Sequence, residues 1–535
     1  MGLLENQKAA ETVDILYQNL ECQLMQNIAR HLKDWEQPID TDRWLMRKLA
    51  EIGKLNKENI KIIAQMSGIS QTAAERMLNE MAEETVKNID PGLRKLARDG
   101  LAGEIVSPNK SRNVKQTVDS MKKQAKDTLN MCNTTMLYKA RNAYSSLVQK
   151  IAIDAKEIEN RQEFIDILNK YGEAVTAGVE SRHQAMRKCI REFNEKGIPA
   201  FIDKRGRQWT PEAYVNMAMR NTARQTAEEV QTARCKDAGV NLIQIDSHSG
   251  ARPRCAKDQG KIFSLDNTSG ETEDLYGKKI KYYPWSSSSY GKPDGILGIN
   301  CRHHKWPFVP GVNIQRYFPT EDYDENDMLY KETQVQRALE RDVRNQKREC
   351  MLYDEIGDTE AFENASVKLK EKEERLKQYV NRHDNLHRRK DREQIVGFDR
   401  RLSAEAISAD RRVQKELAEK AKNDKIKEEI KATGMKGKIT ISPLKKIDVS
   451  EFSFDDAHIN GERSHKVTRE DAERFIQEAD VSFTKWNGRF VNYYGPNGAT
   501  FIDMENNNIR TSFWKDEFDD KARAMREVLE KNGRS

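Results

Sequence analysis

Two cysteines and three histidines gather in one short stretch of the chain, between residues 248 and 311. The stretch opens with HSGARPRCAKDQGKIF, closes with YGKPDGILGINCRHHKWPFVPG, and is rich in glycine and proline. Zinc in proteins binds thiolate and imidazole ligands in a tetrahedron. A zinc site is therefore one interpretation of the stretch. Its candidate ligands are Cys255, Cys301 and one of His248, His303 and His304.

The spacing of these residues is loose for a metal site. The stretch has no Cys-x-x-Cys pair, and Cys-x-His and Cys-x-x-His after Cys301 are weak signals. We therefore commit to no metal ligand from the sequence, and a buried thiol pair or a packing cluster with Trp285, Trp306 and Phe308 is the favoured alternative. No helix with Lys-Ser/Thr follows the glycines, so they do not form a nucleotide phosphate loop.

Helices are predicted before this stretch. Residues 1–200 carry apolar residues at helical spacing, with a break between Pro91 and Pro108, and form either an arm that docks on a partner or a plain bundle. Asp42 is the expected N-cap of one helix. A later helix begins with a Thr210 cap and ends near Gly239. The segment NLIQID that follows reads as a short buried strand.

Charged helices are also predicted after the stretch, over residues 330–352, 361–387 and 404–432. Helices this polar cannot be held by burial alone, so we expect them to pair with one another or with a partner. Three clean heptads are not found, so the pattern does not establish a coiled coil.

Aromatic residues and strand formers become frequent from residue 439 onward. A helix is expected to begin at Thr468, a hairpin to turn at Asn487-Gly488, and two further strands to follow. The predicted fold class is mainly α, with long helical arms, a small irregular central domain and a C-terminal α+β domain in which a helix packs on a small antiparallel sheet. The expected domains are residues 1–200, 201–319, 320–438 and 439–535.

Composition limits the classes of protein that the chain can represent. Of its 535 residues 37% are hydrophobic and 33% charged, which is too hydrophilic for one large globule. The net charge of +6 is a small difference between 92 basic and 86 acidic residues, so charge alone does not indicate nucleic-acid binding. No stretch approaches 18 consecutive apolar residues, and no membrane partner is expected. Seven scattered cysteines without a secretion signal favour a reducing compartment.

The central stretch and its flanks resemble the phage minor capsid protein 2 family, which belongs with the Mu F-like head-morphogenesis proteins of tailed phages. The matching segments are GRQWTPEAYVNMAMRNT, HSGARPRCAKDQGKIF, GILGINCRHHKWPFVPG and YKETQVQRALERDVRNQKRE. The resemblance implies a low-copy virion protein near the portal vertex that helps head assembly or DNA ejection. Its implied partners are the portal and major capsid proteins and phage DNA. It would be made in the host cytoplasm and built into the capsid, and ejection with the genome is an open alternative.

The C-terminal segment resembles phage nuclease domains that are grouped with barnase, EndoU, colicin and RelE-type toxins. The segments that carry this likeness are DDAHINGERSHKVTREDAERFIQEAD, KWNGRFVNYYGPNGATFID and IRTSF. The resemblance implies RNA cleavage without a metal or other cofactor. A base would take the 2′-hydroxyl proton, an acid would protonate the leaving 5′-oxygen, and cations would stabilise the phosphorane.

Within this resemblance, His458 and His465 suit proton transfer, because the ordinary pKa of histidine lies near neutrality. Arg463 and Arg510 suit the phosphate, because a guanidinium is a planar donor of two parallel hydrogen bonds. The alternative for His465 is that it merely precedes the helix cap at Thr468.

Thr511 and Ser512 would hydrogen-bond the phosphate, and Tyr493 or Tyr494 would stack on a base. The alternative is that the tyrosines pack in the core. Residues 443–535 carry 15 Lys/Arg and 18 Asp/Glu, a net charge of 15 − 18 = −3, which counts against RNA binding. The sequence thus predicts a portal-associated minor capsid protein with a toxin-like ribonuclease domain. The alternative is a purely structural virion protein whose C-terminal domain is an inactive attachment module.

Overall fold

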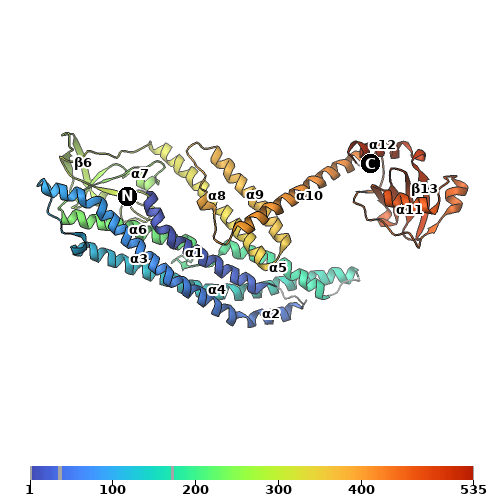
Figure 1. Ribbon diagram of the computed structural model, residues 1–535, viewed down its shortest axis with the longest axis horizontal. Coiled ribbons are helices and arrows are strands. Elements are labelled where there is room, and N and C mark those ends of the chain that lie inside the picture. The colour runs from blue at the N-terminus through green and yellow to red at the C-terminus, as the bar shows by residue number, and fades with distance from the viewer. Residues whose placement is uncertain (1–2, 34–38, 170–173, 534–535) are drawn as a thin grey trace. The chain divides into compact units, whose positions relative to one another are not determined.

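The computed structural model describes residues 3–33, 39–169 and 174–533, so parts of the predicted N-terminal helical region lie outside the described residues. The chain divides into two compact units, unit 1 (Met1–Asp410) and unit 2 (Arg411–Ser535) (Figure 1). Unit 1 is mainly helical with two small sheets, and unit 2 combines helices with a third sheet, which confirms the predicted fold class.

Long helices that lie side by side form the first part of unit 1 (Figure 1). They are α1 (Leu3–Leu32), α2 (Thr41–Ala50), α3 (Ile52–Arg98), α4 (Arg112–Asn169), α5 (Ala174–Lys196) and α6 (Pro211–Asp237). One continuous apolar core runs through them and includes the fully buried rings of Tyr17, Trp44 and Tyr144. Because the helices share this core, they form a bundle, and the docking of this region on a partner stays a prediction.

One detail of the bundle differs from the sequence prediction. Asp40, and not Asp42, caps α2, because the helix begins at Thr41 and the Asp40 carboxylate accepts a hydrogen bond of 2.9 Å from the Arg43 N–H. The predicted break between Pro91 and Pro108 is present, because α3 ends at Arg98 and α4 begins at Arg112, although Pro91 itself lies inside α3. The packing of α3 against α1, α4 and α6 outweighs the cost of the proline, since tertiary contacts routinely override local propensity.

The start of α6 follows the sequence closely. The Thr210 hydroxyl accepts a hydrogen bond of 3.3 Å from the Ala213 N–H, and Pro211 occupies the first helical position. After α6 the chain turns at Gly239, with a positive φ of 70° that glycine adopts without strain. The helix therefore delivers the chain directly into the central sheet.

A five-stranded sheet in the order β5-β6-β4-β3-β7 stands where an irregular domain was expected. Its strands are β3 (Leu242–Ile245), β4 (Ile262–Ser264), β5 (Gly270–Glu273), β6 (Lys279–Pro284) and β7 (Lys305–Phe308). The predicted strand NLIQID is β3, between β4 and β7. A short helix, α7 (Pro253–Ala256), follows β3, and turns without strands fill residues 288–304. A two-stranded sheet of β1 (Phe201–Ile202) and β2 (Gln208–Trp209) precedes α6.

The charged helices that follow are α8 (Tyr323–Ile356), α9 (Thr359–Asn381) and the start of α10 (Arg400–Ala432). As predicted, they pair with one another: α8 packs along α9, and the turn between them has Gly357 at a φ of 79°. Leu339 and Val343 enter the core, whereas Val335 is exposed. The α8–α9 pair also packs on α1 and α5, so these polar helices are held by the bundle.

Unit 2 begins earlier than residue 439, because Ile426 and Ile430 of α10 belong to its apolar core. Its sheet has the order β8-β10-β11-β12-β13-β9 and is antiparallel except for the parallel pair of β13 and β9. The strands are β8 (Lys438–Ile441), β9 (Ser453–Phe454), β10 (Val481–Lys485), β11 (Phe490–Tyr494), β12 (Gly498–Asp503) and β13 (Asn508–Trp514). The predicted hairpin joins β10 to β11 through Asn487 and Gly488, both at positive φ.

Two helices of unit 2 contribute to separate cores. The helix α11 (Arg469–Glu478) begins with a complete capping box between Thr468 and Asp471 and packs over one set of strand residues. The helix α12 (Asp520–Lys531) joins the end of α10 in the other core. The predicted arrangement of one helix on the sheet is therefore incomplete, because helices cover both faces.

Candidate functional site

The two histidines proposed for proton transfer each face a carboxylate in unit 2. The Nδ1 atom of His465 lies 2.6 Å from Oε2 of Glu517, and its ring lies 5.6 Å from the ring of Phe513 in β13. The Nδ1 atom of His458 lies 2.8 Å from Oε2 of Glu462, one helical turn away. The carboxylates are different, so the histidines belong to separate pairs.

The residues proposed for the phosphate are dispersed. Arg510 lies over the ring of Phe490, 4.7 Å from its centroid, while Arg463 is exposed on the turn after His458. Ser512 is buried, and its hydroxyl lies 2.9 Å from that of Thr500. Within the described residues, no contact joins Arg463, Arg510 and His465 in one cleft. The half-buried Thr511 neighbours Phe501 across the sheet.

The two tyrosines proposed to stack on a base lie in the core of unit 2. Tyr493 is 1% exposed and donates its hydroxyl to the Lys445 carbonyl at 3.0 Å. Tyr494 is 7% exposed and packs edge-on against Phe483 and Phe518. A stacking platform needs an open ring face, and these rings are covered.

In unit 1, the sheet brings Cys255, Cys301 and His303 together, with one ligand atom of each within 4.8 Å of the others. Cys255 lies in α7, and the other two lie just before β7. The two Sγ atoms are 3.9 Å apart, and Nδ1 of His303 is 3.3 Å from Sγ of Cys301. The ring of His248, in the loop after β3, stacks on that of His303 with centroids 4.3 Å apart. All four side chains line one cavity of about 130 Å³.

The two cysteine thiols are coupled through their mutual contact. The hydrogen bond from Cys255, helped by His303, holds the pKa of the Cys301 thiol well below its usual range, against the effect of burial. The same contact with Cys301, together with burial, raises the pKa of the Cys255 thiol. The Leu297 N–H also donates to Cys301 Sγ at 3.2 Å.

His304, the third histidine of the stretch, faces away from the thiols toward α6. Its Nδ1 lies 3.0 Å from Oε1 of Glu228, which is itself buried. Burial opposes a charge on His304, but the hydrogen bond and charge of Glu228 outweigh it and raise the pKa of the imidazole. This pair links the start of β7 to α6, so its role is structural and separate from that of the cysteines.

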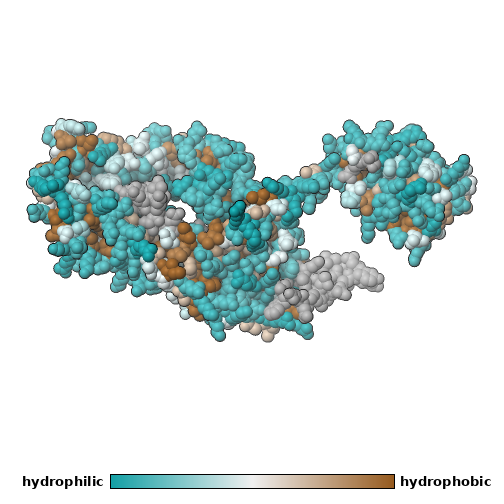
Figure 2. Space-filling view, in the orientation of Figure 1, coloured by the Kyte–Doolittle hydropathy of each residue, from teal (hydrophilic) through white to brown (hydrophobic). Residues whose placement is uncertain are grey.

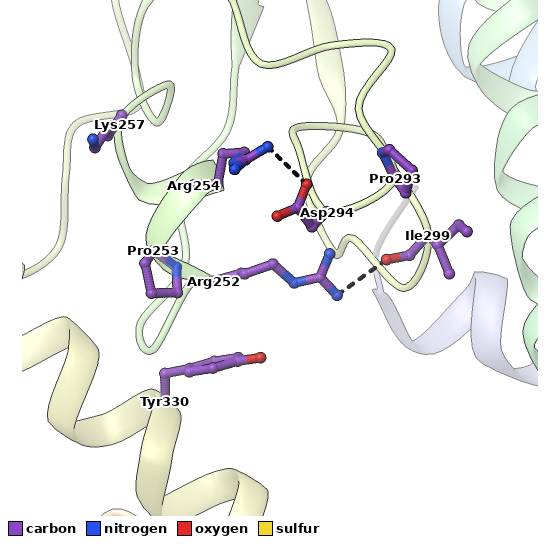
Figure 3. Close-up of a pocket in the computed structure, with 8 residues that line it drawn as sticks. All are labelled: Arg252, Pro253, Arg254, Lys257, Pro293, Asp294, Ile299 and Tyr330. Atoms are coloured by element: carbon purple, nitrogen blue, oxygen red, sulfur yellow. Dashed lines mark hydrogen bonds and ion pairs between the residues drawn. The ribbon is translucent and has the colours of Figure 1, made fainter. Parts of the chain in front are cut away.

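An open cleft of about 710 Å³, drawn in Figure 3, shares the lining residues Arg252 and Tyr330 with the cysteine cavity. Arg252, Arg254 and Lys257 line it from α7 and its start, and Tyr330 reaches it from α8. Its single lining carboxylate, Asp294, is paired with Arg254 at 3.0 Å. The remaining lining side chains are Pro253, Pro293 and Ile299. The cleft thus has an excess of positive charge beside apolar surface.

Sequence reasoning missed the residues that support these sites. Gln259 accepts hydrogen bonds through Oε1 from the His248 N–H at 2.7 Å and lies 3.1 Å from Nε2 of His303. Asn326 of α8 clamps the Ala251 backbone through two hydrogen bonds of 2.7 and 2.6 Å. Neither residue has a sequence signal, because an isolated amide side chain forms its bonds only with partners that the fold supplies.

Comparison with known proteins defines the class of the chain. A curated relative described as "Structural protein" from Lactococcus phage LL-H is 28% identical over 355 residues, which cover 65% of this chain and 88% of the relative. A second "Structural protein", from Lactococcus phage mv4, is 35% identical over 120 residues, which cover 22% of this chain and 95% of that relative. No solved structure matches the chain. These relatives are structural proteins of phages.

Residues 5–381 match the family described as "Phage minor capsid protein 2", and the chain belongs to this family. It is therefore a phage structural protein, with a place in the virion. Within the described residues, no helix is long and apolar enough to cross a bilayer. The visible surface is mostly hydrophilic, with dispersed hydrophobic patches (Figure 2).

Proposed function

We propose that unit 1 is the assembly body by which this protein is built into the capsid beside the portal. The supporting observation is that the family match, residues 5–381, falls wholly inside unit 1 (Met1–Asp410). The residues that identify this capsid family therefore lie in the helical bundle and its sheet. Unit 2 lies beyond the matched residues and is an addition to that body.

The basic cleft is the surface of unit 1 that we assign to a neighbouring virion protein. Arg252 donates to the Ile299 carbonyl at 3.1 Å, which holds its guanidinium at the cleft, and Lys257 is exposed at the same opening. Cationic groups next to Tyr330 and Ile299 suit a peptide segment that carries both carboxylates and apolar side chains. We therefore infer that an acidic segment of the portal or major capsid protein docks here.

Charge reversal in the phage genome tests this docking. Arg252→Glu with Lys257→Glu should lower the number of copies per virion, measured by quantitative mass spectrometry, by at least about tenfold, because like charges across an interface repel. Lys115→Glu with Lys123→Glu on the exposed side of α4 makes the same change in net charge and should leave incorporation intact. Cross-links from Lys257 in wild-type virions should then reach the portal or the major capsid protein.

Equal incorporation of the two variants would refute the docking assignment. Normal incorporation with a loss of packaged DNA in the cleft variant would identify the genome as the partner, and would also refute it. Cross-links that reach the major capsid protein alone would remove the portal from the proposal and leave a capsid-wall location.

A ribonuclease activity of unit 2 is a second candidate, and the pair of His465 and Glu517 favours it. A carboxylate 2.6 Å from Nδ1 keeps a proton on that nitrogen and leaves Nε2 as the base. The exposed Arg463 and Arg510 would have to approach this histidine when RNA binds. The net charge of −3 over residues 443–535 and the covered tyrosine rings favour the alternative, an inactive attachment module.

RNA cleavage by the full chain in the presence of EDTA decides between these two. An active domain leaves 2′,3′-cyclic phosphate ends, and His465→Ala should abolish the cleavage. His387→Ala, a change at an exposed histidine of unit 1, is the matched control and should retain it. A folded chain that leaves RNA intact well above trace enzyme concentration would make unit 2 an attachment module.

A further inference from the structure

We propose that unit 1 binds one zinc ion through Cys255, Cys301, His303 and His248. The inference concerns the cavity between the loops of the central sheet and α8, and does not depend on the docking cleft or on unit 2. Thiolate and imidazole together form a donor set that zinc prefers, and four such ligands make a closed structural site.

The distances between the donor atoms match a tetrahedral zinc site. With Zn–S near 2.3 Å and Zn–N near 2.05 Å, tetrahedral angles place two sulfurs about 3.8 Å apart and a sulfur and a nitrogen about 3.6 Å apart. The corresponding distances here are 3.9 Å between the two Sγ atoms and 3.3 Å between Sγ of Cys301 and Nδ1 of His303. Both agree within about 0.3 Å.

Hydrogen bonds fix the lone pair of His303 on the side of the sulfurs. The backbone N–H of His248 can only donate, so the Gln259 atom that it contacts at 2.7 Å is the carbonyl oxygen Oε1. The same oxygen lies 3.1 Å from Nε2 of His303, which must therefore carry the proton. The lone pair then resides on Nδ1, 3.3 Å from Cys301. A ligating histidine that donates its other N–H to an oxygen is the usual outer-shell arrangement of metal sites.

His248 is prepared as the fourth ligand by the same reasoning. Its Nδ1 lies 3.0 Å from the Ser249 carbonyl, so Nδ1 carries the proton and Nε2 keeps the lone pair. Its ring stacks on the ring of His303, and both line the cavity that contains the two sulfurs. His248 lies outside the group of donor atoms within 4.8 Å of one another, so its ring would have to move for Nε2 to reach the metal.

A zinc ion at this place would join three segments that have little structure of their own. Cys255 comes from α7, His248 from the loop after β3, and Cys301 and His303 from the long turn region before β7. Residues 288–304 contain no strand and no α-helix, and successive turns hold them, for example through the bonds of 3.0 Å from the Gly295 N–H to the Lys292 carbonyl and from the Cys301 N–H to the Gly298 carbonyl. Closure of such loops by a metal contributes directly to folding.

A disulfide and a bare thiol pair are the competing interpretations. A disulfide has an S–S distance near 2.05 Å, far from the 3.9 Å between these sulfurs. A bare thiol pair explains the contact of the sulfurs but gives no reason for two imidazoles whose proton positions are fixed by Gln259 and Ser249.

Metal content of the full chain is the first test. Protein made in zinc-supplemented medium, purified reduced and without chelator, should contain close to one zinc per chain. Cys255→Ser and Cys301→Ser should each reduce the content by at least about tenfold, since loss of a thiolate removes a first-rank ligand. Cys350→Ser, at a buried cysteine of α8, is the matched control and should leave the content unchanged.

Cobalt substitution keeps the proposal testable if a variant fails to fold. Co²⁺ added to the zinc-free wild-type chain should give thiolate-to-cobalt charge-transfer bands and the visible bands of a tetrahedral ion. His248→Ala should keep the charge-transfer bands, but zinc should pass to a chelator at least about tenfold faster. An unchanged rate would overturn the assignment of His248.

Two results would overturn the site as a whole. The first is a folded wild-type chain that takes up less than about a tenth of a zinc per chain and shows no thiolate bands with cobalt, which is incompatible with tight structural binding. The second is a mass two hydrogens below that of the reduced chain, with a peptide that joins Cys255 to Cys301, in protein purified under the same reducing conditions.

Discussion

The buried ion pair between Arg234 of α6 and Asp90 of α3 permits a quantitative prediction. The Arg234 side chain is 0% exposed, and its Nε lies 2.7 Å from Oδ1 of Asp90. A second bond joins Nη2 to Oδ2 of the same carboxylate. The guanidinium also donates to the Val106 carbonyl at 3.0 Å and lies 3.3 Å from the partly exposed Asp237. Asp90→Ala would leave a buried cation with only these two weaker partners.

Removal of one member of a buried pair costs about 3–5 kcal/mol, because the remaining charge loses both water and its partner. The Val106 carbonyl and Asp237 compensate in part, which places the expected loss near the lower limit, at about 3 kcal/mol. This corresponds to a change of roughly two orders of magnitude in the opening equilibrium of α3 and α6.

Native-state hydrogen exchange, followed by mass spectrometry on peptides from α3 and α6, measures this loss without unfolding unit 2. Asp354→Ala is the matched control, since Asp354 pairs with Arg401 at 2.8 Å but Arg401 is 56% exposed. The control should cost less than about 1 kcal/mol. Replacement of both members, as Asp90→Leu with Arg234→Met, should recover more than half of the loss.

A loss below about 1 kcal/mol for Asp90→Ala, equal to that of the exposed control, would refute the argument from burial. A double variant as unstable as the single one would show that the packing of these side chains, and not the uncompensated charge, determines the cost.

Three further predictions concern other parts of the fold. Because Glu228 raises the pKa of His304 above its unfolded value, the stabilisation by this pair is complete below the unfolded pKa and is lost as pH rises through the folded pKa. The melting temperature of unit 1 should therefore fall as the pH rises above the unfolded pKa of histidine, about 6.5, and Glu228→Gln should flatten that slope. Thr468→Ala removes the capping box of α11 and should cost about 1 kcal/mol of unit 2 stability in urea unfolding. Thr484→Ala in β10 is the control that leaves the cap intact. Equal rates of amide hydrogen exchange at the start of α11 in the two variants would contradict the assignment. Gly498→Ala places a Cβ too close to the Phe475 ring and should destabilise unit 2 by about 1–3 kcal/mol. Combination with Phe475→Leu should relieve part of this destabilisation. An unchanged urea midpoint for Gly498→Ala would contradict the expected clash.

Local features of the fold were predictable because each depends on neighbours in the sequence. The cap at Thr210, the capping box at Thr468 and the hairpin at Asn487-Gly488 all lie where the sequence indicates. In each case the hydrogen bonds or the φ angles involve residues within four positions, so the chain contains the whole motif.

Features that depend on partners distant in sequence were predicted poorly. The continuation of α3 through Pro91 was not predictable, because it depends on the packing of α3 against other helices of the bundle. The last domain begins earlier than predicted because Ile426 and Ile430 of α10 pack in an apolar core with residues of α12 and the sheet. The cover over Tyr493 and Tyr494 is likewise formed by side chains from several elements.

The sequence by itself determined the helical character of the chain, its local caps and turns, and the membership in a phage capsid family that specific segments carry. It also indicated Cys255, Cys301, His303 and His248 as candidate metal ligands. Only the tertiary structure decided that these four share one cavity, that His304 turns away to Glu228, and that Gln259 orients an imidazole. The physical reason is that a donor's direction and protonation are set by what the fold places around it, and spacing along the chain does not contain that information.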